Sequence, residues 1–191
     1  MILPRWMALT VASTLWVVAI PLVHAVVPWG LSSLGPRRGW AQGQPGIWNM
    51  CGLVPVLVGA VCLLWVLVLH LVETPEQVAL RWTPRYLLRR GPYAFTRNPM
   101  YLAEVVVWLG WTLWFGSVAV LVGVILLWAA IQFGVLPREE RALEERLGEV
   151  YRQYQDAVPR WLWQGHQPLG PAEREPRAGG PTSPRKTREG S

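Results

Sequence analysis

The chain has 191 residues, of which 52% are hydrophobic and 13 are Trp, and its formal net charge is +6. This length allows one domain, or a small domain with a tail, and a soluble domain cannot bury that much apolar surface. The positive charge lies beside apolar runs and forms no basic stripe with interleaved aromatic residues, which excludes a nucleic-acid partner. The composition instead indicates a membrane protein, in which Trp favours the bilayer interface.

Four apolar runs follow one another along the chain. They predict an all-α, polytopic integral membrane protein with about four transmembrane helices, at residues 6–29, 47–71, 100–115 and 118–135. The first two runs exceed the roughly 20 residues that a helix needs to cross a bilayer core. The last two are shorter and meet at Gly116 and Ser117, which predicts a helical hairpin with a tight turn.

The first apolar run has a second interpretation. Arg5, the run itself and the small-residue segment from Val23 to Ala25 imitate a secretory signal peptide with its cleavage site. The run is long for a signal peptide and continues through Trp29, so we favour a retained transmembrane helix.

The two cysteines, Cys51 and Cys62, fall in the second run. The helix between them separates the two residues by roughly 16 Å, which is too far for a disulfide. Their pattern predicts neither a redox site nor a metal site.

Basic residues set the expected orientation. With both termini in the cytoplasm, 16 of the 18 Lys and Arg residues are cytoplasmic, and the opposite orientation would reverse that ratio. The positive-inside rule therefore favours cytoplasmic N- and C-termini, and we expect a bacterial inner (plasma) membrane as the location.

Residues 138–156 have the composition of an amphipathic helix that follows the last span on the cytoplasmic side. Apolar residues recur there at three- and four-residue steps and form one stripe: Leu136, Leu143, Leu147, Val150, Tyr151, Tyr154 and Val158. Glu140 falls on this stripe, whereas Glu144 and Glu145 do not. Because a buried carboxylate needs a partner, Glu140 either pairs with a loop arginine or holds a ligand.

The stretch from Arg89 to Glu104 leads into the third run. Asn98 is a good N-cap and Pro99 suits the first helical position, so the third helix starts there. Its positive dipole end, with Arg97 beside it, suits a carboxylate or phosphate. Glu104 lies about one turn inside the helix, on a face with aromatic residues. It suits a cationic group, or it reaches up to water from an aromatic belt.

Several blocks of this sequence resemble the membrane methyltransferases, a group that includes isoprenylcysteine carboxyl methyltransferases and phosphatidylethanolamine N-methyltransferases. The blocks are Gly91-Pro92-Tyr93, Arg97-Asn98-Pro99-Met100-Tyr101-Leu102, the hairpin, and Glu139-Glu140. The run from Leu147 to Tyr154 and the following Val158-Pro159-Arg160 resemble the C-terminal signature of the group. The match covers residues 87–162.

The resemblance implies S-adenosylmethionine as methyl donor and a lipophilic acceptor among the membrane lipids, such as a prenylcysteine-type carboxylate or an aminophospholipid. It implies these donor-binding residues: Arg97, Asn98, Pro99, Tyr101, Glu139 and Glu140. Arg97 and Tyr101, with Glu104 inside the helix, are the candidates for catalysis. Asn98 replaces the usual His and Ala103 the usual Gly. Asn cannot act as an acid or base near neutral pH, which puts a mechanism that needs that His in question.

With this interpretation, the sequence has three parts. Residues 1–72 hold two transmembrane helices and their loop, and residues 73–163 form the catalytic core of basic loop, hairpin and amphipathic helix. Residues 164–191 are rich in Pro, Gly and charged residues and predict a disordered tail.

Methyl transfer fits these residues because the protein chiefly has to align donor and acceptor. The glutamate pair at 139 and 140 suits the donor's ammonium or ribose hydroxyls, and the helix start with Arg97 suits its carboxylate. A carboxylate acceptor needs no base. An amine acceptor has to lose a proton, in which Glu104, Tyr101 or His70 could take part.

Two other functions stay open. Membrane sterol and enoyl reductases, which use NADPH, carry a similar element that ends in an acid, and Glu104 fits that acid. A non-enzymatic membrane scaffold is the third reading, but it leaves Glu140 and the segment from Arg97 to Tyr101 without a ligand. The paired glutamates and the helix after them favour methyl transfer.

The orientation gives the first testable prediction. A reporter enzyme fused after Ser191 should be active only in the cytoplasm, because the basic residues hold that end of the chain inside. Reporter activity outside the membrane would contradict this topology. Loss of about 25 N-terminal residues from the mature protein would favour the signal peptide instead.

Overall fold

The computed structural model of the chain describes residues 2–4, 22–73, 77–79 and 87–162, together with a few single residues between positions 7 and 19. The predicted tail at 164–191 and most of the first predicted span before Leu22 lie outside the described residues. The described chain is mostly helical, with two antiparallel strand pairs. β1 (Ile2–Pro4) pairs with β4 (Gln77–Ala79), and β2 (Trp40–Ala41) pairs with β3 (Gln44–Pro45).

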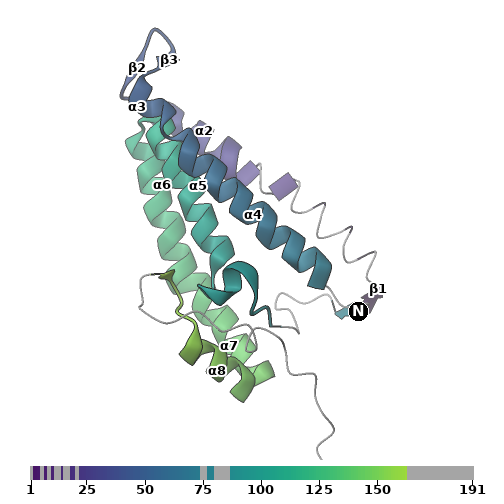
Figure 1. Cartoon of the computed structure of the whole chain (residues 1–191). Coiled ribbons are helices and arrows are strands. Elements are labelled where there is room, and N and C mark those ends of the chain that lie inside the picture. Colours follow the sequence, from purple (N-terminus) through teal and green to yellow (C-terminus); the bar gives the residue numbers. More distant parts are fainter. Residues whose placement is uncertain are drawn as a thin grey trace, which may run out of the picture.

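Three helices make the body of the bundle, in which α5 packs against both α4 and α6 (Figure 1). They are α4 (Leu53–Glu73), α5 (Pro99–Phe115) and α6 (Val118–Ala129). The first segment, which packs on α5 and α6, consists of the π-helix η1 (Leu22–Val26), α2 (Val27–Leu31) and the 3-10 helix η2 (Ser32–Leu34). The remaining elements are α3 (Ile47–Met50), the 3-10 helix η3 (Gly91–Ala94), the π-helix η4 (Ala130–Val135), α7 (Leu136–Leu147) and α8 (Glu149–Ala157).

Glycines allow α4 and α5 to approach closely. A Cβ on Gly59 would lie 2.8 Å from the Ala103 carbonyl oxygen and 2.6 Å from a methyl group of Val107. A Cβ on Gly110 would lie 2.7 Å from the Gly52 carbonyl oxygen. Small residues at such crossings let backbones pack where lipid offers no hydrophobic driving force between helices.

The predicted hairpin between the third and fourth runs is confirmed. α5 ends at Gly116, whose φ of +56° is a left-handed conformation that glycine adopts without strain. The Ser117 hydroxyl then accepts a hydrogen bond from the Val120 amide and caps α6. The Arg38 amide donates to the Gly116 carbonyl at 3.1 Å, so the first loop and the hairpin turn lie at the same end of the bundle.

Two helical stretches in the described chain are long and apolar enough to cross a membrane, at Ile47–Val72 and Val118–Leu147. Only 22% and 17% of their apolar windows are buried within the protein, so most of each surface is available to lipid. These stretches agree with the second and fourth predicted spans. α5 has 17 residues and forms the centre of the bundle, and the count of four spans stays a prediction.

The expectation of one amphipathic helix at residues 138–156 is wrong, because two helices, α7 and α8, form this segment. α7 continues directly from α6 through η4, so no break separates it from the last apolar run. Gly148, at φ +53°, then ends α7 and turns the chain into α8. The stripe is otherwise confirmed, because Leu136, Tyr151 and Tyr154 are buried, but Val150 is exposed after the turn.

The close α4–α5 crossing predicts that Gly59→Ala destabilises the protein. Its Cβ would press on a backbone oxygen and a packed valine, and overpacking of this kind costs about 1–3 kcal/mol. Gly30→Ala in α2 is the matched control, because a Cβ there meets nothing within 4 Å. Thermal melting of the two variants in the same lipid environment makes the comparison, and equal melting temperatures would contradict the packing argument.

Candidate active site

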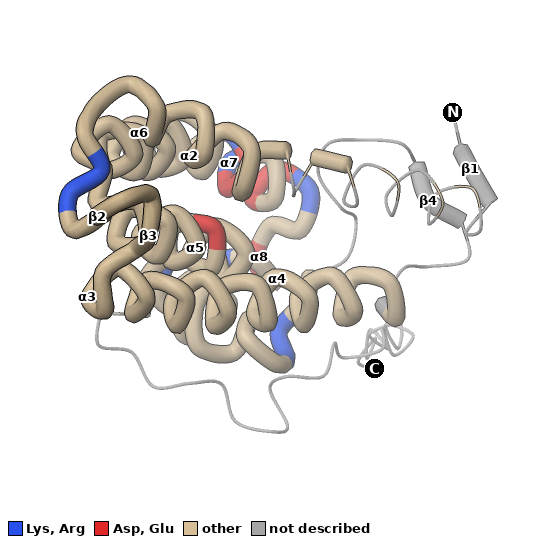
Figure 2. The backbone as a smooth tube through the Cα atoms, turned by 90° about the horizontal axis from the view of Figure 1, so that it is seen from above, with Lys and Arg blue, Asp and Glu red and all other residues tan. Residues whose placement is uncertain are grey.

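Charged residues of the described chain lie mainly at the two ends of the bundle (Figure 2). Arg37 and Arg38 lie beside β2 at one end, and the charged residues of α7 and α8 lie at the other. Within the body of the bundle, α5 carries one acidic residue, Glu104. The candidate site is built where α5 begins, at the end formed by α7 and α8.

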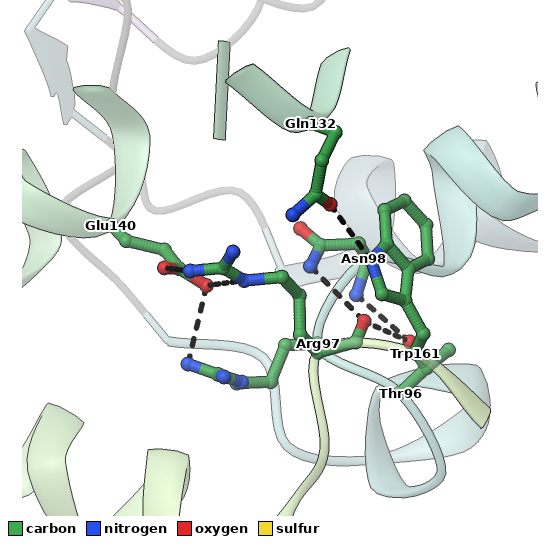
Figure 3. A network of polar contacts seen from close by, with 7 residues as sticks. Thr96, Arg97, Asn98, Gln132, Glu140 and Trp161 are labelled. Carbon is green, nitrogen blue, oxygen red and sulfur yellow. Dashed lines mark hydrogen bonds and ion pairs between the residues drawn. The ribbon is translucent and has the colours of Figure 1, made fainter. Parts of the chain in front are cut away.

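Glu140 is the centre of this site (Figure 3). Its Oε1 lies 3.2 Å from Nη1 of Arg97 and accepts a 3.0 Å hydrogen bond from Nε of Arg160. Arg160 Nη2 pairs with the second carboxylate oxygen, so this contact is bidentate. The side chains of Glu140 and Arg97 are each only 12% exposed. The salt-bridge interpretation of Glu140 is therefore confirmed, although one of the two partners, Arg160, lies outside the predicted loop.

The segment that carries Arg160 is bound to the start of α5 through its backbone. The Arg160 carbonyl accepts hydrogen bonds from the Thr96 hydroxyl at 2.8 Å and from the Asn98 amide at 3.2 Å. The Pro159 carbonyl accepts from the Arg97 backbone amide at 2.9 Å. These hydrogen bonds fix the position of the backbone at Arg97 (Figure 3).

Asn98 occupies the predicted N-cap position and Pro99 begins α5, as expected. The predicted capping by the Asn98 side chain is wrong, because that side chain makes no cap hydrogen bond. Its amide group is used instead to bind Arg160 across the junction.

A second contact joins α5 to α7. The Tyr101 hydroxyl donates a 2.9 Å hydrogen bond to Oε1 of Glu139. Glu104 follows Tyr101 by three residues and lies deeper in the bundle, with its side chain 17% exposed. Oε1 of Glu104 is 4.0 Å from Nε2 of His24 in η1.

The π-helix η4 supplies another polar group. Gln132 accepts a 2.9 Å hydrogen bond from the Trp161 indole (Figure 3). Trp161 packs in one cluster with Ile131 and Leu136, against which Tyr101 is also packed. The C-terminal segment is thus held both by a hydrogen bond and by apolar packing of Trp161.

α8 packs against α7 beside the site. Burial raises the pKa of the Tyr154 phenol, which keeps it protonated and able to donate to the Tyr93 carbonyl at 2.7 Å. Burial also raises the pKa of Tyr151, and the Glu140 carboxylate raises it further. The Tyr93 hydroxyl in turn lies 2.9 Å from Nε2 of His70 and is hydrogen-bonded to it. His70, which the sequence offers as a proton acceptor, therefore takes part in a contact with Tyr93.

The structure brings the predicted donor-binding residues together in two contacts, Arg97 with Glu140 and Tyr101 with Glu139, beside the start of α5 at Asn98 and Pro99. Sequence reasoning missed the roles of Arg160, Gln132, Trp161 and His24. Arg160 belongs to the C-terminal block of the resemblance, and this was the available signal. Neither π-helix has a recognisable sequence pattern, so nothing indicated Gln132 or His24.

Comparison with known proteins adds a family and a relative. The model of a family described as phospholipid methyltransferase matches residues 48–150, which include Arg97 to Glu140. An uncharacterized protein of Haemophilus influenzae is 41% identical over 63 residues, which are 33% of this chain and all of the relative. No solved structure matches the chain.

The contacts of Glu140 predict that Glu140→Gln destabilises the protein even without ligand. Two guanidinium groups would lose their shared counterion, and breaking a largely buried pair costs on the order of 3 kcal/mol. Glu144→Gln is the control, because its 3.4 Å contact with Arg152 is exposed and such pairs contribute at most about 1 kcal/mol. Melting curves that place both variants at the wild-type temperature would refute a structural role for Glu140.

Proposed function

Because the chain belongs to the phospholipid methyltransferase family, we propose that it is an S-adenosylmethionine-dependent membrane methyltransferase that acts on a lipophilic acceptor. The family indicates a methyltransferase, and the two long apolar helical stretches fit a membrane location. The resemblance drawn from residues 87–162 is confirmed at the level of the family. The donor, the acceptor and the orientation in the membrane are proposals.

The observation that carries the proposal is the placement of the matched polar residues. Arg97, Tyr101, Glu139 and Glu140 lie within the family match and meet in side-chain contacts at one end of α5. A structural junction alone would be satisfied by neutral, paired groups. Here the contact of Glu140 with two arginines has an excess of positive charge, and Glu139 beside it adds a negative charge. Such an arrangement suits a donor that carries both a carboxylate and an ammonium group.

The basic side fits the carboxylate of the donor. Two guanidinium groups, of Arg97 and Arg160, face the single carboxylate of Glu140, which leaves one positive charge in excess. Nε of Arg97 is buried and has no hydrogen-bond partner among the described residues. A buried guanidinium with an unused N–H is well suited to a planar anion.

The acidic side fits the ammonium group. Glu139 is oriented by the Tyr101 hydroxyl through Oε1, and within the described part of the chain no hydrogen bond reaches its second oxygen. Glu104 adds a further carboxylate deeper along α5. When bound, S-adenosylmethionine supplies a methyl group activated by its sulfonium. Arg97 would hold the carboxylate and Glu139 the ammonium of its amino-acid group, and Tyr101 would fix Glu139 in place. Glu104 would face the acceptor side.

The apolar faces of α4 and α6 support a lipid acceptor. Both helices expose large aliphatic side chains along most of their length, including Leu57, Val61, Leu64, Leu121 and Ile125. An acceptor dissolved in the bilayer can approach the bundle laterally along such surfaces. A prenylcysteine-type carboxylate and an aminophospholipid are both compatible with these faces.

The two ends of the bundle support the proposed orientation. Arg38 lies beside the hairpin turn, whereas Arg97 and the arginines of α7 and α8 lie at the opposite end. The excess of basic residues at the site end favours a cytoplasmic site, where S-adenosylmethionine is present as a soluble metabolite.

Donor binding tests this function. Added S-adenosylmethionine should raise the melting temperature of the purified protein by mass action, and NADPH should not. Arg97→Ala should weaken donor affinity by about 1.5–3 kcal/mol through loss of a charge-assisted contact. Arg141→Ala, on the exposed side of α7, is the control. Stabilisation by NADPH and not by S-adenosylmethionine would replace the proposal with a reductase.

A further inference from the structure

Two arginines lie at the end of the bundle opposite the candidate active site. Arg37 and Arg38 precede β2 and lie beside the hairpin turn (Figure 2). In the proposed orientation they are the two basic residues outside the cytoplasm, on the side where Lys and Arg are normally depleted. Membrane topology therefore does not explain why they are there.

No carboxylate offsets the charge of these arginines. The sequence has no Asp or Glu at positions 1–72 or 105–138, and η2, β2, β3, α3 and the hairpin turn all fall in these ranges. At the other end of the bundle, by contrast, Arg97 is paired with Glu140. The end that carries Arg37 and Arg38 thus has an excess of positive charge, which an anion from outside the chain can neutralise.

The Arg37 guanidinium is held in place by its neighbours. Its Cζ lies 5.2 Å from the ring centre of Trp40 and 5.1 Å from that of Phe115. Its Nη2 donates a 2.9 Å hydrogen bond to the Ser32 hydroxyl. Trp40 is fixed in turn, because its indole N–H donates to the Trp114 carbonyl at 2.9 Å. A guanidinium positioned in this way loses little conformational freedom when it binds a phosphate group.

Arg38 is held by its backbone, and its side chain is exposed. The Arg38 amide donates to the Gly116 carbonyl at 3.1 Å, and the Arg38 carbonyl accepts a 3.0 Å hydrogen bond from the Asn49 side chain. The side chain supplies a second guanidinium next to Arg37 in the chain. A substitution that changes only this side chain leaves both backbone hydrogen bonds in place.

Exposed apolar side chains indicate how deep this end lies in the bilayer. Leu34, Ile47 and Trp48 are 75%, 72% and 83% exposed. Ile47 and Trp48 begin the long apolar stretch Ile47–Val72, and an exposed Trp at such a position is typical of the membrane interface. Because Asn49, directly after Trp48, binds the Arg38 carbonyl, the arginines lie at the level of the lipid headgroups. Phosphate groups are the anions available there.

We propose that Arg37 and Arg38 form a binding site for the phosphate of an anionic phospholipid in the leaflet at this end of the bundle. Arg37 provides a fixed guanidinium and Arg38 a second one, and the exposed apolar residues contact the adjoining part of the lipid. A headgroup with net negative charge binds better than a zwitterionic one, because the site has no carboxylate to receive an ammonium group. The site is independent of methyl transfer, so either function can fail without the other.

Lipid-dependent melting tests the choice of ligand. The full-length protein in uncharged detergent micelles is titrated with phosphatidylglycerol, with phosphatidylcholine of the same acyl chains, and with inorganic phosphate. We expect phosphatidylglycerol to raise the melting temperature in a saturable manner and the other two to leave it nearly unchanged. Equal effects of the two lipids overturn the proposed site. Full stabilisation by inorganic phosphate alone overturns a lipid as the ligand.

Substitutions at Arg38 separate this site from general charge attraction. Arg38→Gln should weaken the apparent affinity for phosphatidylglycerol by about fivefold, as expected for one basic residue near an anionic surface, and Arg38→Lys should recover part of the loss. Without added lipid, Arg38→Gln should melt as wild type, because its backbone hydrogen bonds remain. Arg141→Gln removes the same charge from the exposed side of α7 and should leave the affinity unchanged. Equal losses in Arg38→Gln and Arg141→Gln, or no loss in Arg38→Gln, overturn the proposal.

Discussion

The carboxylate of Glu140, shared between two arginines, is the contact on which the rest of the site depends. Arg97 stands just before α5 and Arg160 follows α8, so one buried anion joins three segments that are distant in the sequence. The cost of burying the charge is offset only because the contact to Arg160 is bidentate and the surrounding backbone is hydrogen-bonded. The start of α5, α7 and the C-terminal segment are therefore placed together, and the donor-binding residues are placed with them.

The apolar part of the bundle has a different constraint. Glycines at 52, 59 and 110 let α4 and α5 meet backbone to backbone, which leaves large side chains to face outward. A few polar side chains are nevertheless buried among the apolar helices. Glu104 and His24 are two of these groups, and their side chains lie 4.0 Å apart about one turn beyond the donor site. The proposed chemistry thus occurs where the charged end of the protein meets its lipid-facing body.

Much of the fold could be predicted because its signals are local. The length of the apolar runs predicted the helices, and Gly116 with Ser117 predicted the hairpin. The three- and four-residue stripe predicted that Glu140 is buried but not that Arg160 binds it, because Arg160 lies in an irregular segment without periodicity. The break at Gly148 was missed because helix-forming residues surround it. The side-chain role of Asn98 depends on a carbonyl 62 residues away, which no local pattern reveals.

The most direct test of the account is a structure of the protein in a lipid nanodisc with S-adenosylhomocysteine, the product form of the donor. The account predicts that the carboxylate of the bound product lies within hydrogen-bond distance of the Arg97 guanidinium. Its ammonium should face Glu139, and the Glu140–Arg160 pair should remain intact. A product bound away from Arg97, with the junction unchanged, would contradict the account and leave the Glu140 cluster with a purely structural role.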